Sequence, residues 1–138
     1  MNAVDTNILV YAVDRHEPEK RQTALSLLRD LYTRPEPLVL LWQVAVEFVA
    51  CLHRWRASDR IGMVDLQSYI TNFVEPVPIS MPGSGSLHRS VELVEKYALS
   101  HWDSLLIAAC IDAEVETLFT EDMQAGATYD DVRIVNPF

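Results

Sequence analysis

The chain has 138 residues, of which 49% are hydrophobic and 22% are charged. This size and hydrophobic content suffice for one domain with a single core, and they exclude an intrinsically disordered chain. Because 20 acidic residues outnumber 11 basic ones, the formal net charge is -9, which excludes a protein that simply coats nucleic acid.

The two cysteines, Cys51 and Cys110, each lie in an apolar run. Buried reduced thiols are typical of a cytosolic protein, so we expect a cytoplasmic location and no disulfide framework. The sequence shows neither a cationic start followed by an apolar stretch nor a window of about 18 apolar residues. We therefore expect neither secretion nor membrane insertion, and we expect one domain over residues 1–138.

The first half of the chain reads as strand, helix, strand and two helices. The opening residues are apolar and predict a buried strand that turns at residues 5–7. One-sided spacing of alanine and leucine predicts an amphipathic helix over residues 17–32. A brief apolar run at residues 38–41 predicts a strand, and two helices are predicted over residues 42–55 and 64–74.

The second half continues the alternation of helices and strands. A helix is predicted over residues 87–98, capped by Ser84 or Ser86, and a second helix, apolar almost all round and therefore central, over residues 102–113. Short extended segments are predicted at residues 76–79, 117–120 and 132–135. This order predicts an α/β fold with a central, mostly parallel sheet of about four to five short strands flanked by helices.

Four acidic residues occupy places where ligands collect in an open parallel sheet. Asp5 and Asp122 follow predicted strands, Asp103 begins an apolar helix, and Glu47 is the only charge in residues 41–52. Converging carboxylates repel one another unless a cation neutralises them, and Mg²⁺ or Mn²⁺ prefers such oxygen ligands. Ions held in this way activate water for hydrolysis of a phosphodiester bond.

Three of these acids also have a structural interpretation. Ser100 and Asp103 have the spacing of a capping box at the start of a helix. Asp5 and Asp122 are equally suited to capping a helical turn that follows each of them. Taken singly, these acids leave capping and metal binding open.

Glu47 raises a different question, because it lies on an apolar helix. Burial of a carboxylate costs roughly several kcal/mol of desolvation free energy unless a cation or a hydrogen-bond donor compensates it. The structural alternative is an ion pair with an arginine such as Arg54 or Arg89. The functional alternative is a metal ion.

Four segments, taken in order along the chain, resemble the PIN-domain family and in particular its VapC-type toxins. They are Val4–Tyr11, Glu47–Phe48, Trp102–Ala109 and Phe119–Gly126, and the ending Arg133–Phe138 is also similar. The resemblance implies a PIN-like fold and a Mg²⁺- or Mn²⁺-dependent endoribonuclease, the toxin of a toxin-antitoxin pair. It also implies an antitoxin protein and an RNA substrate as partners, and a homodimer.

The resemblance assigns roles to individual residues. The acidic quartet that would bind metal and carry catalysis corresponds to Asp5, Glu47, Asp103 and Asp122. Polar partners that would orient an acid or a bound water correspond to Thr6, Asn7 and Thr120. Residues 43–46 depart from the pattern, because many relatives have a polar residue just before the glutamate.

The densest basic segment contains His53, Arg54, Arg56 and Arg60. Its arginines are candidates for binding RNA phosphates, which supply most non-specific affinity. A solvated helix end, where cations complement the helix dipole, explains the same residues equally well.

The three tryptophans, Trp42, Trp55 and Trp102, lie in apolar runs at helical spacing. Core packing is therefore predicted for them in preference to stacking on RNA bases.

Two other functions compete with the nuclease. A PIN-like scaffold would bind RNA or a protein without cleaving, and its acids would only cap helices and form ion pairs. A phosphatase of the haloacid dehalogenase type needs Asp-x-Asp after the first strand, whereas Asp5 is followed by Thr6 and Asn7. Asp130 and Asp131 are predicted to form a turn outside the site.

Overall fold

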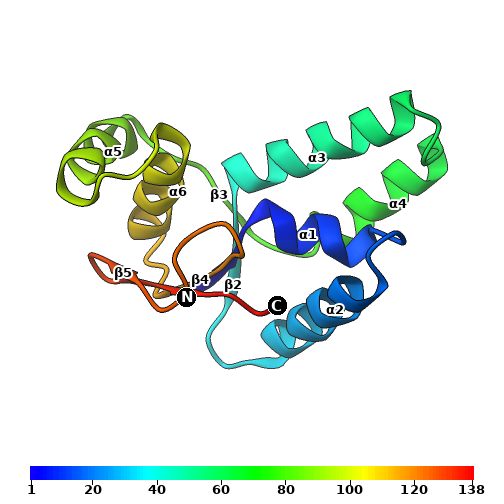
Figure 1. Cartoon of the computed structure of the whole chain (residues 1–138), viewed down its shortest axis with the longest axis horizontal. Coiled ribbons are helices and arrows are strands. Elements are labelled where there is room, and N and C mark those ends of the chain that lie inside the picture. Colours follow the sequence, from blue (N-terminus) through cyan, green and yellow to red (C-terminus); the bar gives the residue numbers. More distant parts are fainter.

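A sheet of six short strands forms the centre of the computed structural model, which describes residues 1–138 (Figure 1). The strand order is β3-β2-β1-β4-β6-β5, and every neighbouring pair is parallel except β5 with β6. The predicted α/β class with a mostly parallel sheet is confirmed. The strands are β1 (Asn2–Val4), β2 (Leu38–Leu41), β3 (Ile79–Ser80), β4 (Thr117–Phe119), β5 (Thr128–Tyr129) and β6 (Val132–Val135).

The helices flank this sheet in pairs. In Figure 1, α5 and α6 lie together at one end of the molecule, α3 and α4 lie towards the other, and α1 lies beside α2. No helix combines the length and the hydrophobicity needed to cross a lipid bilayer. The helices are α1 (Thr6–Val13), α2 (Pro18–Thr33), α3 (Trp42–Ala57), α4 (Met63–Phe73), α5 (Ser84–Tyr97) and α6 (His101–Asp112).

Helix α6 is central, as its sequence predicts. Ile107, Ala108 and Cys110 have no exposed surface, and Ser104 is also fully buried. Cys51 is buried too, and both cysteines are free, which confirms the prediction for the thiols. Burial raises the pKa of both thiols, so they behave as small core residues.

The opening of the chain differs from its prediction. Strand β1 ends at Val4, and a full helix, α1, begins at Thr6, where the sequence predicted only a turn. The β-branched residues of this segment look strand-like. However, Ile8, Leu9, Ala12 and Val13 have the spacing of one buried side of a helix, and Asp5 caps the first turn.

Two other local predictions were wrong. Helix α5 is preceded by Gly83, with no side-chain cap, and Ser86 instead donates a hydrogen bond to Asp112. Ser84 is already the first helical residue. Strand β5 was not predicted, so the sheet has six strands where the sequence predicted four to five. Asp130 and Asp131 form the turn between β5 and β6, as predicted.

Core packing was predicted for all three tryptophans, but it holds only for Trp55, which packs against the core from a half-buried position. Trp42 is 44% exposed and Trp102 is 65% exposed. Both lie in the first turn of their helices, beyond the carboxyl edge of the sheet, where the core ends. Their spacing is helical, but spacing alone does not show where a helix leaves the core.

Candidate active site

The register of two parallel strands brings the first acid to the end of β4. Val4 lies opposite Phe119, and the backbone N–H of Asp5 donates to the Phe119 carbonyl at 2.9 Å. Thr120, which follows Phe119, is therefore placed beside Asp5. This is the carboxyl edge of the sheet, where polar side chains of neighbouring strands meet.

Asp5 is buried and lies in a network of donors. Its carboxylate accepts from the Thr6 backbone N–H at 2.6 Å, from the Thr120 hydroxyl at 2.7 Å and from Asn7 Nδ2 at 3.3 Å. Burial holds the pKa of Asp5 above its ordinary value, although the bonds from Thr120 and Thr6 oppose the shift and the charges of Asp122 and Glu47 add to it. A cation at this site would relieve the same desolvation and repulsion.

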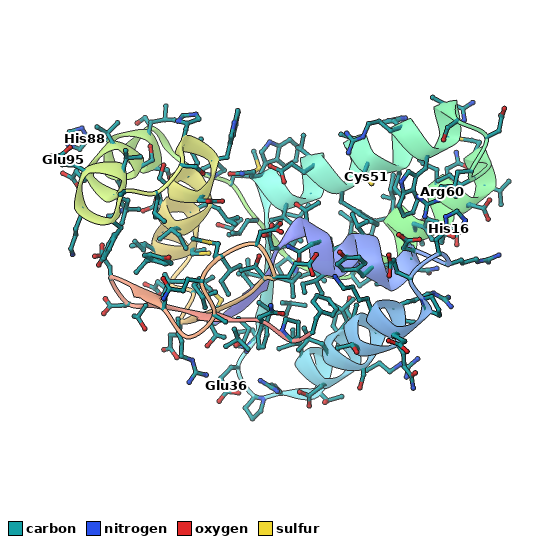
Figure 2. The ribbon with its side chains drawn as sticks, viewed as in Figure 1. His16, Glu36, Cys51, Arg60, His88 and Glu95 are labelled. Atoms are coloured by element: carbon teal, nitrogen blue, oxygen red, sulfur yellow. The ribbon has the colours of Figure 1, made fainter.

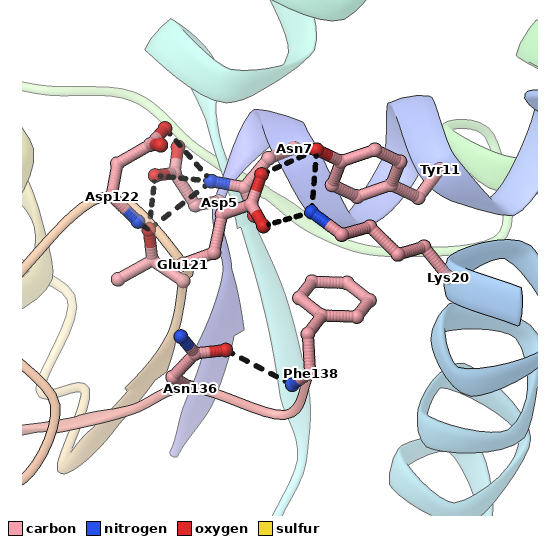
Figure 3. Close-up of polar contacts among 9 residues, drawn as sticks. Asp5, Asn7, Tyr11, Lys20, Glu121, Asp122, Asn136 and Phe138 are labelled. Atoms are coloured by element: carbon pink, nitrogen blue, oxygen red, sulfur yellow. Dashed lines mark hydrogen bonds and ion pairs between the residues drawn. The ribbon is translucent and has the colours of Figure 1, made fainter. Parts of the chain in front are cut away.

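Asn7 joins the two strand-end acids (Figure 3). Its Nδ2 lies within donor distance of Asp5 at 3.3 Å, Thr120 Oγ1 at 3.2 Å and Asp122 Oδ2 at 3.0 Å. The backbone N–H of Asp122 also donates to Thr120 Oγ1 at 3.1 Å. The Oδ1 of Asn7 is buried and has no hydrogen-bond partner, which is unusual for a buried acceptor in a folded protein.

Glu47 reaches the site from α3. The Thr6 hydroxyl donates to it at 2.8 Å, and Gln43 Nε2 donates at 3.0 Å. Glu47 is exposed, so the expected desolvation does not arise. The arginine alternative is wrong: no ion pair joins Glu47 to Arg54, and Arg89 pairs with Asp112.

The polar partner of Glu47 was missed in the sequence. Residues 43–46 were said to depart from the family pattern because no polar residue stands just before the glutamate. Gln43 supplies one from a full helical turn earlier. The separation of four residues was the available signal, since such residues share a helix face.

Asp103 is not joined to the other acids. Its backbone N–H donates to Ser100 Oγ at 3.1 Å, so the predicted cap by Ser100 is present, but the reciprocal bond of a capping box is not. The half-buried carboxylate of Asp103 makes no hydrogen bond within the chain. Asp122, in contrast, caps no helix, because a turn follows it.

A second contact, which the sequence did not predict, fixes the segment that carries Asp122. The neighbouring Glu121 accepts from the Tyr11 hydroxyl at 2.5 Å and from Lys20 Nζ at 2.7 Å (Figure 3). Burial opposes ionisation of Glu121, but the bonds from Lys20 and Tyr11 prevail and lower its pKa. No sequence pattern linked α1 and α2 to the residue beside Asp122.

Two open cavities, of about 430 and 480 Å³, are partly lined by α3. Four residues of the site line the larger one: Thr6, Asn7, Glu47 and Asp122. This larger cavity, which we call the acidic cavity, is also lined by Arg54 and by further polar and apolar residues of α1 and α3. Arg60 does not line it: its guanidinium bonds to Asp14 and stacks on Trp55, 4.0 Å from the ring centroid. Figure 2 shows Arg60 beyond Cys51, towards the end of α3.

The oxygen ligands of the site fit a divalent cation. Asp5, Glu47 and Asp122 offer carboxylates, which Thr6 and Asn7 join through hydrogen bonds. No three acidic, histidine or cysteine side chains are grouped closely enough to enclose an ion by themselves. Mg²⁺ keeps several waters and commonly uses only one or two carboxylates, so a full protein cage is not required.

Thr120 is expected to hold the site together. In a Thr120→Val variant, Asp5 loses a donor and the Asp122 N–H loses its acceptor, so the free energy of unfolding should fall by about 1–3 kcal/mol. Metal affinity should fall by about 10- to 100-fold. Urea unfolding and titration with Mn²⁺ measure the two effects.

Thr117→Val, on the same strand, is the control for Thr120→Val because the Thr117 side chain makes no hydrogen bond. Its free energy of unfolding should change by less than about 0.5 kcal/mol. Equal effects of the two substitutions would contradict the role given to the Thr120 hydroxyl.

These features define a parallel α/β domain with an acidic site at the carboxyl edge of its sheet. The PIN domain family model matches residues 3–129, so the chain belongs to the PIN-domain family, as the resemblance implied. No protein of curated function matches the sequence.

Solved structures share this fold at low sequence identity. A toxin-antitoxin complex from Klebsiella pneumoniae has a TM-score of 0.69 and 20% identity, over 100% of this chain and 98% of that one. VapBC2 from Rickettsia felis, bound to a DNA fragment from its promoter, gives 0.67 and 19%, over 96% of each chain. VapC20 from Mycobacterium tuberculosis, a toxin that cleaves the sarcin-ricin loop, gives 0.61 and 14%, over 86% and 87%.

Proposed function

We propose that this protein is a Mg²⁺- or Mn²⁺-dependent endoribonuclease and the toxin of a toxin-antitoxin pair. The observation that carries the proposal is the joining of Asp5, Glu47 and Asp122 through Thr6 and Asn7. Membership of the PIN-domain family supports it, and so does the similarity to a toxin that cleaves the sarcin-ricin loop. An RNA substrate and free thiols are consistent with action in the cytoplasm.

The side chains of the site would have two different roles in hydrolysis. Asp5 and Asp122, with Glu47 and Asp103, would hold the divalent ion, and the bound ion would activate a water and stabilise charge on the phosphate. Thr120 and Asn7 fix the directions of the Asp5 and Asp122 carboxylates. In this role they limit the movement of the ligands, which is how outer partners tune a metal site.

Arg54 is the basic residue best placed to receive the RNA. It lines the acidic cavity, whereas Arg60 is engaged by Asp14. A guanidinium beside the carboxylates would hold a phosphate in two hydrogen bonds, against the repulsion of the acids. Of the predicted RNA-binding residues, we keep Arg54 as a contact with RNA and assign Arg60 to the structure. Arg56 lines neither of the two open cavities and stays a prediction.

Incubation of the purified protein with total RNA tests the proposal. We expect cleavage with Mg²⁺ or Mn²⁺, none with EDTA, and a strong loss of cleavage in Asp122→Asn. Asp130→Asn is the control, since that acid lies in the β5–β6 turn and bonds to Lys96. RNA binding without cleavage in any metal would favour the non-catalytic scaffold instead.

We also propose two protein partners. An antitoxin would place a basic side chain among the carboxylates, and the net charge of -9 would assist its approach. A second copy of the chain would cover an exposed apolar face formed by α3, α5 and α6. The large side chains of this face include Trp42, Leu87 and Trp102, and they surround a cavity of about 430 Å³.

A charge on this face should separate the homodimer. We expect Trp102→Arg, at a side chain that is 65% exposed, to yield monomers in analytical ultracentrifugation under conditions where the unsubstituted chain is dimeric. Val64→Arg is the matched control, because Val64 is 79% exposed on α4, away from this face. An unchanged mass for Trp102→Arg would place the dimer interface elsewhere.

A further inference from the structure

A groove along α2 carries basic residues that the acidic site does not use. Its volume is about 270 Å³, and Arg15, Arg21 and Arg29 line it together with Pro18, Gln22 and Leu25. No acidic side chain lines this groove. On a chain with a net charge of -9, such a group is a local reversal of the overall charge.

The helix and the loop before it produce this arrangement. Arg21, Leu25 and Arg29 are four residues apart and therefore share one face of α2. Arg15 comes from the α1–α2 loop, in which Asp14 accepts from the His16 backbone N–H at 2.9 Å. The three arginines form no ion pair, whereas Arg34, at the end of the same helix, pairs with Asp30.

A second, smaller cavity adjoins the groove and extends to α3. Arg15 lines this cavity too, whose volume is about 110 Å³, together with His16, Trp55 and Arg60. Trp55 follows Arg54 on α3, and Arg54 lines the acidic cavity. Figure 2 shows His16 and Arg60 close together at this end of the molecule. Asp14 offsets the charge of Arg60, and Asp65 also lines the smaller cavity, so the unpaired positive charge in this region comes from Arg54 and the groove.

We infer that the α2 groove binds backbone phosphates of the RNA on one side of the bond to be cut, an inference that rests on the proposed function. A chain this acidic repels a polyanion, so affinity has to come from a local basic surface. Arginine side chains bind phosphates in paired hydrogen bonds. The groove has no aromatic lining on which bases could stack, so its contacts are with the backbone and independent of sequence.

Salt-dependent binding of two RNAs tests this inference. The probes are oligoribonucleotides of about 4 and about 16 nucleotides, the short one able to occupy only the acidic cavity. Asp5→Asn is present in every protein to prevent cleavage. The double substitution Arg21→Gln and Arg29→Gln is compared with Arg34→Gln and Arg133→Gln, which removes the same charge at exposed sites outside the groove.

For the long RNA, log affinity should fall less steeply with log salt in the groove variant. The slope should become shallower by about 0.7 for each phosphate contact that is lost. The slope of the control should not change, and binding of the short RNA should be unchanged in both. Equal slopes in the groove variant and the control would overturn the inference. If the groove variant still binds RNA but no longer binds polyglutamate, the inference is also overturned. The groove would then be assigned to an acidic protein segment.

A cleavage assay of the chain without substitutions, run beside these binding measurements, separates the two proposals. If the chain without substitutions cleaves RNA and the slopes are equal, only the groove is wrong. If that chain does not cleave RNA, the proposed function is wrong, and the groove with it.

Discussion

RNA cleavage by the Asp5→Asn variant should fall by more than about 10²-fold. This loss is larger than the usual effect of removing a residue that only hydrogen-bonds to a metal ligand. Its free energy of unfolding in EDTA should change by no more than about 1 kcal/mol. Asparagine is also a good helix cap and can accept from the Thr6 N–H. The hydrogen bonds lost to Thr120 and Asn7 are offset by removal of a desolvated charge.

The effect of Asp5→Asn on stability should depend on pH. In the folded chain the pKa of Asp5 is raised above 3.8, so the folded state keeps this proton to a higher pH than the unfolded state does. The Asp5 contribution to stability therefore falls as pH rises from about 3.8 through the raised pKa, and is constant above it. Asp5→Asn lacks this pH dependence, so its free energy of unfolding should rise relative to that of the unsubstituted chain over this pH range.

Urea unfolding in EDTA across this pH range, with a parallel RNA cleavage assay, measures both effects. Adding Mn²⁺ should stabilise the unsubstituted chain and leave the variant unchanged. A variant that cleaves RNA at the ordinary rate would remove Asp5 from the mechanism. A variant that loses stability relative to the unsubstituted chain as pH rises would contradict the cause assigned to the raised pKa.

Phe48→Ala should have the largest effect on stability. Phe48 has no exposed surface and follows Glu47 on α3. The cavity left by its ring should lower the free energy of unfolding by about 3–5 kcal/mol, a large part of the roughly 5–15 kcal/mol of an ordinary domain. Since α3 would also lose its attachment to the core, Glu47 would be held less firmly, and cleavage should fall even where the variant remains folded.

Val46→Ala is the control for Phe48→Ala. Val46 precedes Glu47 and is 46% exposed, so its truncation should change the free energy of unfolding by less than about 0.5 kcal/mol. Both variants are measured by urea unfolding, and cleavage is assayed at a temperature where both are folded. A loss below about 1 kcal/mol for Phe48→Ala would show that α3 packs differently from the structure.

Asp5 and Asp122 could be assigned to one edge of the sheet from the sequence, because strands that alternate with helices pair in parallel and end together. The contact between Thr6 and Glu47 could not be predicted in this way. It depends on how α3 crosses α1, and no periodicity along the chain encodes that crossing. The same limit explains Trp42 and Trp102: spacing predicts a helix, but not which turn extends beyond the core.

The sequence also does not show which charged residues form ion pairs in the folded chain. The dense basic segment contains Arg60, whose partner Asp14 lies 46 residues away in the chain. The free arginines of α2 do not stand out in the sequence, because Glu19 precedes Arg21 and Asp30 follows Arg29. Only the folded helix separates Arg21 and Arg29 from these acids and places them on a common face.

The contact between Lys20 and Glu121 joins the arginine groove to the acidic site. Lys20 is on α2, the helix of the arginine groove, and Glu121 is next to Asp122. The surface that would anchor the RNA and the acid that would help cut it thus share one rigid support. Cleavage should consequently occur at a constant number of nucleotides from the anchored stretch, whatever the base sequence in between.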